Sequence, residues 1–186
     1  MTQTRLLTGQ VLRFKGDPFV EGPDAAIHDI HGAVAIRDGR IMAVGDVDTV
    51  RAACPGAAET AYGSALILAG FVDAHTHYPQ TAIIASWGKR LIDWLNTYTF
   101  PEEMRFDDPA YAREIAGRYL DLVLSHGTTT VASFCTIHED SVTAFFEAAQ
   151  ARDMAVVAGK TCMDRNAPDA LCDTAQSAYD LSLIHI

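Results

Sequence analysis

The sequence predicts an α/β protein: the first three βα units of an incomplete (β/α)8 barrel, preceded by a small β-sheet. Two observations lead there. After residue 65, apolar strand-like runs alternate with segments of helical periodicity, and such alternation predicts parallel strands. A His-x-His pair, His75 and His77, directly follows the first of these runs. Barrels place active-site groups at the carboxyl ends of strands, whereas a doubly wound sheet would carry a glycine-rich phosphate loop there.

The composition is that of a globular protein, since 49% of the 186 residues are hydrophobic and 20% are charged. A formal net charge of −10 argues against a nucleic-acid partner, which needs clustered Lys and Arg. No apolar run reaches the ~18 residues of a membrane span, and the start has no signal-peptide core. We therefore expect a cytoplasmic protein without a membrane partner. The four scattered cysteines form no C-x-x-C pair, which predicts reduced thiols.

Residues 1–64 read as short strands and turns. The run Leu6–Phe14 is strand-like, and the apolar runs at 32–36 and 41–45 flank Asp38-Gly39, a strong hairpin signal. We expect an antiparallel sheet here, followed by a loop or short helix over 47–63. This part has no cluster of His, Cys or acidic residues, so we interpret it as a packing module.

Strand one of the second part is expected from about Ala65 to Asp73. An irregular segment, 78–106, follows it, with helical spacing of apolar residues over 91–98 that we expect Phe100-Pro101 to end. A segment of this length between strands is more often functional than idle. Its large aromatic side chains are each predicted to be core: Trp87, Trp94 and Phe100.

The next helix begins at Asp108-Pro109, with Asp as N-cap and Pro in the first turn, and ends at Gly127. Its predicted buried stripe is Ala112, Ile115, Ala116, Tyr119, Leu122 and Val123. The remaining elements are expected in this order: a strand at Thr128–Phe134, a helix from Asp140 or a neighbour with Val142, Phe145, Phe146 and Ala149 on one face, a strand at Met154–Ala158, and a helix at Asp169–Asp180.

The stretch Leu68–Gln80 holds the candidate metal ligands. Residues two apart on a strand point the same way, so His75 and His77 aim two imidazoles at one point, where a divalent metal could sit. Asp73 is expected on the same face, either as a further metal contact or hydrogen-bonded within the barrel mouth. Two imidazoles leave the site incomplete, because catalytic zinc usually has three protein ligands.

Other polar residues are weaker candidates. His138 follows the second strand at the functional end and could touch a metal, or be a solvent-facing or N-capping histidine. His126 precedes that strand, at the wrong end for a site. Asp164 and Asn166 lie on the loop after the third strand, where they could be functional or stabilise the loop.

The end of the chain breaks the pattern. Residues 181–186, Leu-Ser-Leu-Ile-His-Ile, are apolar without a polar face and resemble one translated frame of a sequencing adaptor. We expect them to be a non-native tail, with the natural gene continuing past Asp180. Residues 65–180 are too few for a closed barrel, which takes about 250 residues.

Several motifs resemble a known family. Ala69-Gly-Phe-Val-Asp-Ala-His-Thr-His77 resembles the first-strand motif of the amidohydrolase superfamily, whose members are metal-dependent hydrolases. Narrower motifs resemble its guanine deaminase branch: Tyr78-Pro79-Gln80, Trp94-Leu-Asn-x-Tyr-Thr-Phe-Pro-x-Glu103, Gly127-Thr-Thr-Thr130 and Gly159-Lys-x-Cys-Met-Asp-x-Asn166.

The resemblance implies a TIM-like barrel beside a β-sandwich built from both chain ends, so residues 1–64 would be part of a sandwich and 65–180 part of the barrel. It implies one zinc ion, with His75 and His77 as ligands, and guanine as the small-molecule substrate, contacted by His77, Tyr78, Pro79 and Gln80. It also implies that the longer protein can form a homodimer. The reaction would be hydrolytic deamination of guanine to xanthine and ammonia, with the acid/base residue and further ligands outside this chain.

Two alternatives remain open. Another amidohydrolase could act on a different heterocycle or on a chlorinated ring, although Gln80 and the 94–101 block argue against it. Outside the enzymes, the 186 residues alone could be a stable, non-catalytic fragment that binds metal weakly, because the metal shell and the acid/base group are incomplete.

Overall fold

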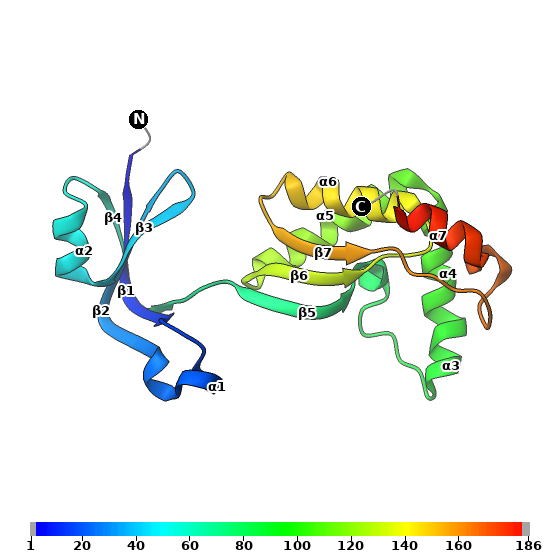
Figure 1. The fold of residues 1–186 in the computed structure, drawn as a ribbon, viewed down its shortest axis with the longest axis horizontal. Coiled ribbons are helices and arrows are strands. Elements are labelled where there is room, and N and C mark those ends of the chain that lie inside the picture. Colours follow the sequence, from blue (N-terminus) through cyan, green and yellow to red (C-terminus); the bar gives the residue numbers. More distant parts are fainter. Residues whose placement is uncertain (1–2, 184–186) are drawn as a thin grey trace. The chain divides into compact units, whose positions relative to one another are not determined.

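The structure, a computed structural model, describes residues 3–183 (Figure 1). Contacts divide the chain into two compact units, 1–69 and 70–186. None of the described helices is both long and apolar enough to cross a membrane. All four cysteines are free thiols, as predicted.

The first unit is a four-stranded sheet in the order β3-β2-β1-β4. Its elements are β1 (Arg5–Phe14), β2 (Ala26–Arg37), β3 (Arg40–Asp46) and β4 (Ala58–Ile67), with α1 (Pro18–Glu21) and α2 (Val47–Ala53) between them. The predicted hairpin is confirmed: β2 and β3 are antiparallel, and Asp38 and Gly39 between them both have positive φ. The sheet is nevertheless mixed and not purely antiparallel, because β4 pairs with β1 in parallel.

The strand expected from about Ala65 to Asp73 is wrong, because its two halves belong to different sheets. Leu66 and Ile67 end β4 and pair with β1, whereas β5 (Phe71–His77) starts a second sheet. Gly70 lies just before β5, where the chain passes so close to the second sheet that a Cβ atom would come within 2.1 Å of the Thr129 hydroxyl. A glycine is needed for this close approach.

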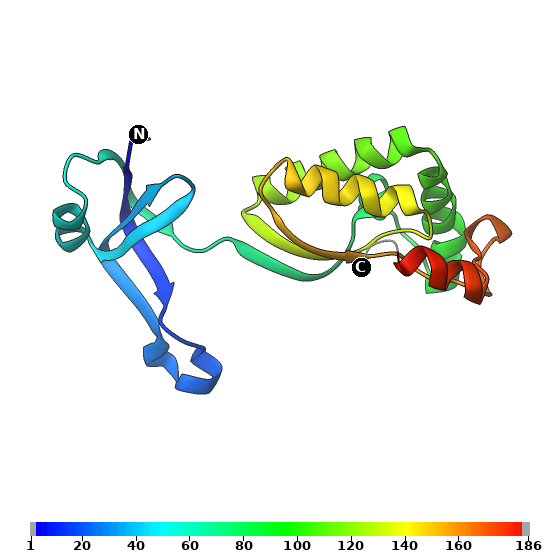
Figure 2. The same ribbon diagram turned by 45° about the horizontal axis from the view of Figure 1, so that its top comes forward.

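The second unit holds the parallel sheet that the βα order predicts (Figure 2). β5, β6 (Thr128–Phe134) and β7 (Ala155–Gly159) lie in that order, all parallel. Both α5 (Pro109–Ser125) and α6 (Glu139–Gln150) lie on the same face of the sheet (Figures 1 and 2). The core between helices and sheet contains fully buried large side chains: Tyr78, Phe106, Ile115, Leu120, Val131 and Phe145.

The α5 helix begins as predicted. Asp108 is its N-cap, with a carboxylate that accepts a hydrogen bond from the Ala110 N–H at 2.8 Å. Its buried stripe differs from the prediction, since Leu120 is fully buried, the expected Leu122 is 40% exposed and Val123 is only half-buried. The α5 helix also ends as predicted, because Gly127 takes a positive φ after its last turn.

Replacing Asp108 with alanine is expected to lower the free energy of unfolding by about 1 kcal/mol, because the N–H groups of the first turn lose their acceptor. Urea denaturation followed by circular dichroism measures the change. Asp108→Asn is the matched control, since asparagine caps about as well as aspartate. Equal loss in both variants would contradict the capping role.

The segment after β5 is a long interrupted helix. A 3-10 turn (Tyr78–Ile83) leads to α3 (Leu91–Trp94), a π-helical turn (Leu95–Thr99), α4 (Phe100–Glu103) and a 3-10 turn (Met104–Asp107). The prediction that Phe100-Pro101 ends the helix is wrong. The Phe100 N–H bonds to the Leu95 carbonyl, five residues back. The wider turn places Pro101, which lacks an N–H, in the first turn of α4 without ending the helix.

Three further expectations change, the first being that Phe146 of α6 is 39% exposed although it was expected on the same face as the buried Val142 and Phe145. Trp87 is 76% exposed and not core, whereas Trp94 is half-buried and Phe100 is buried as predicted. The helix expected at Asp169–Asp180 is instead a 3-10 turn (Asp169–Leu171) followed by α7 (Ala175–Leu183). That residues 181–186 are a non-native tail stays a prediction, and residues 184–186 lie outside the described part of the chain.

Candidate metal and substrate site

The two predicted metal-ligating histidines lie together at the carboxyl end of β5. The ring centroids of His75 and His77 are 5.4 Å apart. Both rings contact Phe134 at the end of β6: His77 stacks on it with centroids 4.9 Å apart, and His75 meets it edge-on. Burial, and then the neighbouring His75, lower the pKa of His77. The lowered pKa favours the neutral imidazole, which is the form that binds a metal.

Asp73 does not share the face of the two histidines, so that expectation is wrong. A β-bulge lies between Asp73 and Thr76, where two residues of β5 lie opposite one residue of β6. Asp73 is therefore in register with Val131, which is fully buried beneath the helices, whereas His77 is in register with Phe134. The Asp73 carboxylate accepts a hydrogen bond from the His75 N–H at 3.1 Å. It thus orders the backbone of the bulge, as the hydrogen-bonding alternative predicted, and Asp73 lines the same cavity as His77.

The residues after His77 divide between core and cavity. Tyr78 is fully buried: its hydroxyl donates to the Ser141 carbonyl at 2.5 Å, and its ring stacks on Phe145. Burial raises its pKa. Pro79 is buried as well. Their side chains therefore support the site from beneath, and contact with a ligand stays a prediction about their backbone. Gln80 is only half-buried and reaches the cavity described next.

A cavity of about 450 Å³ lies beside β5. His77, Gln80 and Trp94 line it together with Tyr119 of α5. A second cavity, of about 420 Å³, includes His75 and Phe134 in its wall. His77 thus lines the first cavity, together with Gln80, and His75 lines the second.

The Gln80 amide is held by Glu103, a residue of α4 that the sequence identified only as part of a motif. Gln80 Nε2 donates a hydrogen bond to Glu103 Oε1 at 3.2 Å. Glu103 is 8% exposed, and its burial raises its pKa while the hydrogen bond from Gln80 lowers it. A contact between residues 23 positions apart leaves no periodic signal in a sequence.

Within the described residues, no group of three or more His, Cys, Asp or Glu side chains is placed to hold a metal. His138 is neither solvent-facing nor a side-chain cap. It lies at the N-cap position of α6 without a capping hydrogen bond, its side chain is 17% exposed, and burial lowers its pKa. His126 is exposed and lies after α5, just before β6, at the end of the sheet away from the histidine pair, as expected. Among residues 3–183, the two imidazoles remain the candidate metal ligands.

Comparison with known proteins identifies the family of the chain. The model of the amidohydrolase family matches residues 66–184, well over half of the chain. The chain belongs to the amidohydrolase family. Residues 32–57 also match a bacterial imidazolonepropionase-like composite domain.

Within the amidohydrolases, the chain is similar to guanine deaminases. It is 43% identical to guanine deaminase of Escherichia coli K12 over 81% of its own length. The solved guanine deaminase of Bradyrhizobium japonicum matches 99% of the chain with a TM-score of 0.90 and 36% identity, covering 40% of that protein. That of C. acetobutylicum, with guanine bound in its active site, matches 96% of the chain with a TM-score of 0.78 and 27% identity, covering 41% of that protein. The chain spans 35% of the E. coli relative, and its α/β fold matches that of these structures.

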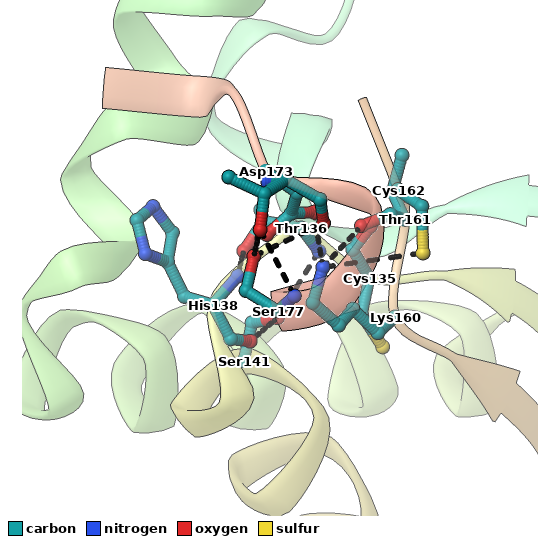
Figure 3. Close-up of polar contacts among 10 residues, drawn as sticks. Cys135, Thr136, His138, Ser141, Lys160, Thr161, Cys162, Asp173 and Ser177 are labelled. Carbon is teal, nitrogen blue, oxygen red and sulfur yellow. Dashed lines mark hydrogen bonds and ion pairs between the residues drawn. The ribbon is translucent and has the colours of Figure 1, made fainter. Parts of the chain in front are cut away.

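A second polar cluster of this amidohydrolase lies after β7, where Lys160 is buried against Asp173 (Figure 3). Their side chains are 1% and 7% exposed, and the Lys160 ammonium also donates to the Thr161 carbonyl at 3.0 Å. Cys162 Sγ lies 4.0 Å from it. Figure 3 shows His138 turned away from this cluster. The pair ties the end of β7 to the segment before α7. A lysine directly after an apolar strand is the signal that could have drawn attention to it.

The loop between Lys160 and Asp173 carries the two weaker candidates, Asp164 and Asn166, and both are exposed to solvent. Asp164 is exposed and lies 3.7 Å from Arg165 in an ion pair, and Asn166 is exposed with a φ of 60°. Asparagine tolerates this left-handed conformation better than most residues. The described contacts therefore favour loop stabilisation for both.

Proposed function

We propose that this chain is the N-terminal part of a zinc-dependent guanine deaminase, which converts guanine and water to xanthine and ammonia in purine catabolism. The observation that carries the proposal is the placement of His77 and Gln80 in the wall of one cavity. The similarity to guanine deaminases over most of the chain supports the choice of substrate. The longer protein would be cytoplasmic and able to form a homodimer.

The proposed architecture is a TIM-like barrel of which residues 70–180 supply the first three βα units; the part expected to start at residue 65 starts later because Leu66 and Ile67 pair in the first sheet. Parallel strands covered on one face by helices support it, as do the unpaired outer edges of β5 and β7 among the described residues. A free parallel edge is normally covered or paired. The first unit, residues 1–69, would form part of a β-sandwich, and 181–186 would be a non-native tail.

The residues present are of a type that binds zinc. His75 and His77 would hold it, since imidazole nitrogen suits Zn²⁺ and the lowered pKa of His77 favours its unprotonated ring. What such an ion supplies is activation of water for hydrolysis at neutral pH. Two ligands are fewer than the three that a catalytic zinc usually has, so the others would come from later strands.

The proposed substrate contacts come from the segment 77–80. Gln80 offers an amide to the polar edge of the purine, and hydrogen bonds of this kind let a site reject analogues that lack them. Tyr78 and Pro79 would contribute through their backbone and fix the direction of Gln80. The relative with guanine in its active site supports this choice of ligand. We assign no catalytic acid or base to this chain.

The test uses the longer protein encoded past Asp180, loaded with zinc. We expect guanine-dependent release of ammonia with formation of xanthine, abolished by a chelator and restored by zinc. A chlorinated triazine offered in place of guanine is expected to be inert. Turnover of the triazine without turnover of guanine would contradict the proposal and favour the alternative amidohydrolase.

The 186-residue chain by itself is expected to release no ammonia from guanine above background, because its metal shell and acid/base group are incomplete. The same ammonia assay, run on the purified chain with added zinc, measures this. Zinc-dependent turnover by the chain alone would show that the residues present suffice.

A further inference from the structure

The orientation of the Gln80 amide depends on what faces its nitrogen. Gln80 lines the cavity with His77 and Trp94, and its Nε2 atom lies 3.2 Å from Glu103 Oε1. An amide has a donor end and an acceptor end of nearly equal size, so packing alone does not select between the two orientations. A carboxylate can only accept hydrogen bonds, and therefore it selects the orientation in which the amide nitrogen faces it.

Glu103 is well placed to do this because it is itself fixed. It lies at the end of α4 and is 8% exposed. Its neighbour Glu102, equally buried, points elsewhere: it accepts from the Tyr111 hydroxyl and pairs with Arg105 at 3.0 Å. The two adjacent carboxylates thus serve separate contacts, and only that of Glu103 reaches a residue of the cavity wall.

We infer that Glu103 is a positioning residue that locks the Gln80 amide so that the cavity receives its carbonyl oxygen and one remaining N–H. This inference rests on the proposed function for the identity of the ligand. An exposed carbonyl oxygen accepts from ring N–H and exocyclic NH2 groups, which guanine carries side by side. The lock therefore favours a 2-amino-6-oxopurine over purines without those donors.

The first experiment is a double-mutant cycle in the longer protein. Glu103→Gln keeps the size of the side chain but lets Gln80 take either orientation. We expect kcat/KM for guanine to fall about three- to tenfold, mainly through a higher KM, because an ordered side chain is lost from the free site. In a Gln80→Leu background, Glu103→Gln is expected to have no further effect, since it acts through Gln80.

Glu102→Gln is the matched control, and it is expected to leave KM for guanine unchanged. The inference is overturned if Glu103→Gln stays within twofold of the unmodified protein. It is equally overturned if its effect persists in full in the Gln80→Leu background, which would indicate a general structural role.

A second measurement separates this inference from the proposed function. In the 186-residue chain, the side-chain NH2 resonances of Gln80 are identified by NMR through their loss in Gln80→Leu. They are expected to shift in Glu103→Gln and not in Glu102→Gln. Unchanged resonances in Glu103→Gln would overturn the lock even if guanine is the substrate. A longer protein inactive on guanine would overturn the proposed function and leave the lock to the NMR result.

Discussion

Replacing Lys160 with methionine is expected to lower the free energy of unfolding of the second unit by about 3–5 kcal/mol, because Asp173 would be left as a buried, unpaired charge. Urea denaturation followed by the fluorescence of Trp87 and Trp94 measures it, since both tryptophans belong to this unit. The loss is large because the two side chains are almost fully buried and water cannot replace the missing partner.

Two further variants make this prediction sharp. Lys160→Met combined with Asp173→Leu removes both charges and is expected to recover most of the lost stability. Arg118→Met breaks the exposed pair with Glu114 and is expected to cost about 0–1 kcal/mol. A double variant as unstable as the single one would show that packing, and not the unpaired charge, sets the cost.

Substituting His75 or His77 with glutamine in the longer protein is expected to lower both zinc affinity and kcat/KM for guanine by more than about 100-fold each, since loss of an outer partner of a ligand already costs 10–100-fold. Zinc per protomer, measured by atomic absorption after dialysis, and ammonia release give the two readouts. His126→Gln is the matched control, because that histidine is exposed at the opposite end of the sheet. A His77→Gln variant that keeps its zinc and activity would contradict the metal assignment.

The parts of the fold that were predictable are those that local sequence determines. The Asp38-Gly39 hairpin needed two residues with positive φ, and Asp108-Pro109 carried both a cap and a fixed backbone angle. The parallel sheet followed from the alternation of strands and helices. In each of these cases the signal and the structure occupy the same few residues.

The failures have a common cause, which is that long-range pairing decided the outcome. The apolar run at 65–68 was equally suited to either sheet, and pairing with β1 placed Leu66 and Ile67 in the first. The bulge in β5 places the Asp73 side chain on the other face of the strand from the two histidines, because side chains alternate between faces only in an uninterrupted strand. Trp87 is exposed although its large aromatic side chain suggested a place in the core.

The candidate site divides in the same way. His75 and His77 were found because ligand spacing within a strand is local. Glu103 and Lys160 were not assigned roles, because their partners, Gln80 and Asp173, lie far along the chain.

The π-helical turn at Leu95–Thr99 sets the direction in which the side chains that follow it point around the helix axis. An α-helix advances about 100° per residue, so one extra residue in a turn rotates all later side chains by that angle. Deleting a single residue from this turn would restore a regular helix and swing Glu103 out of line with Gln80, without altering either side chain. The orientation of the Gln80 amide in the cavity thus depends on the number of residues in the helical turn before Glu103 as well as on the identity of Glu103.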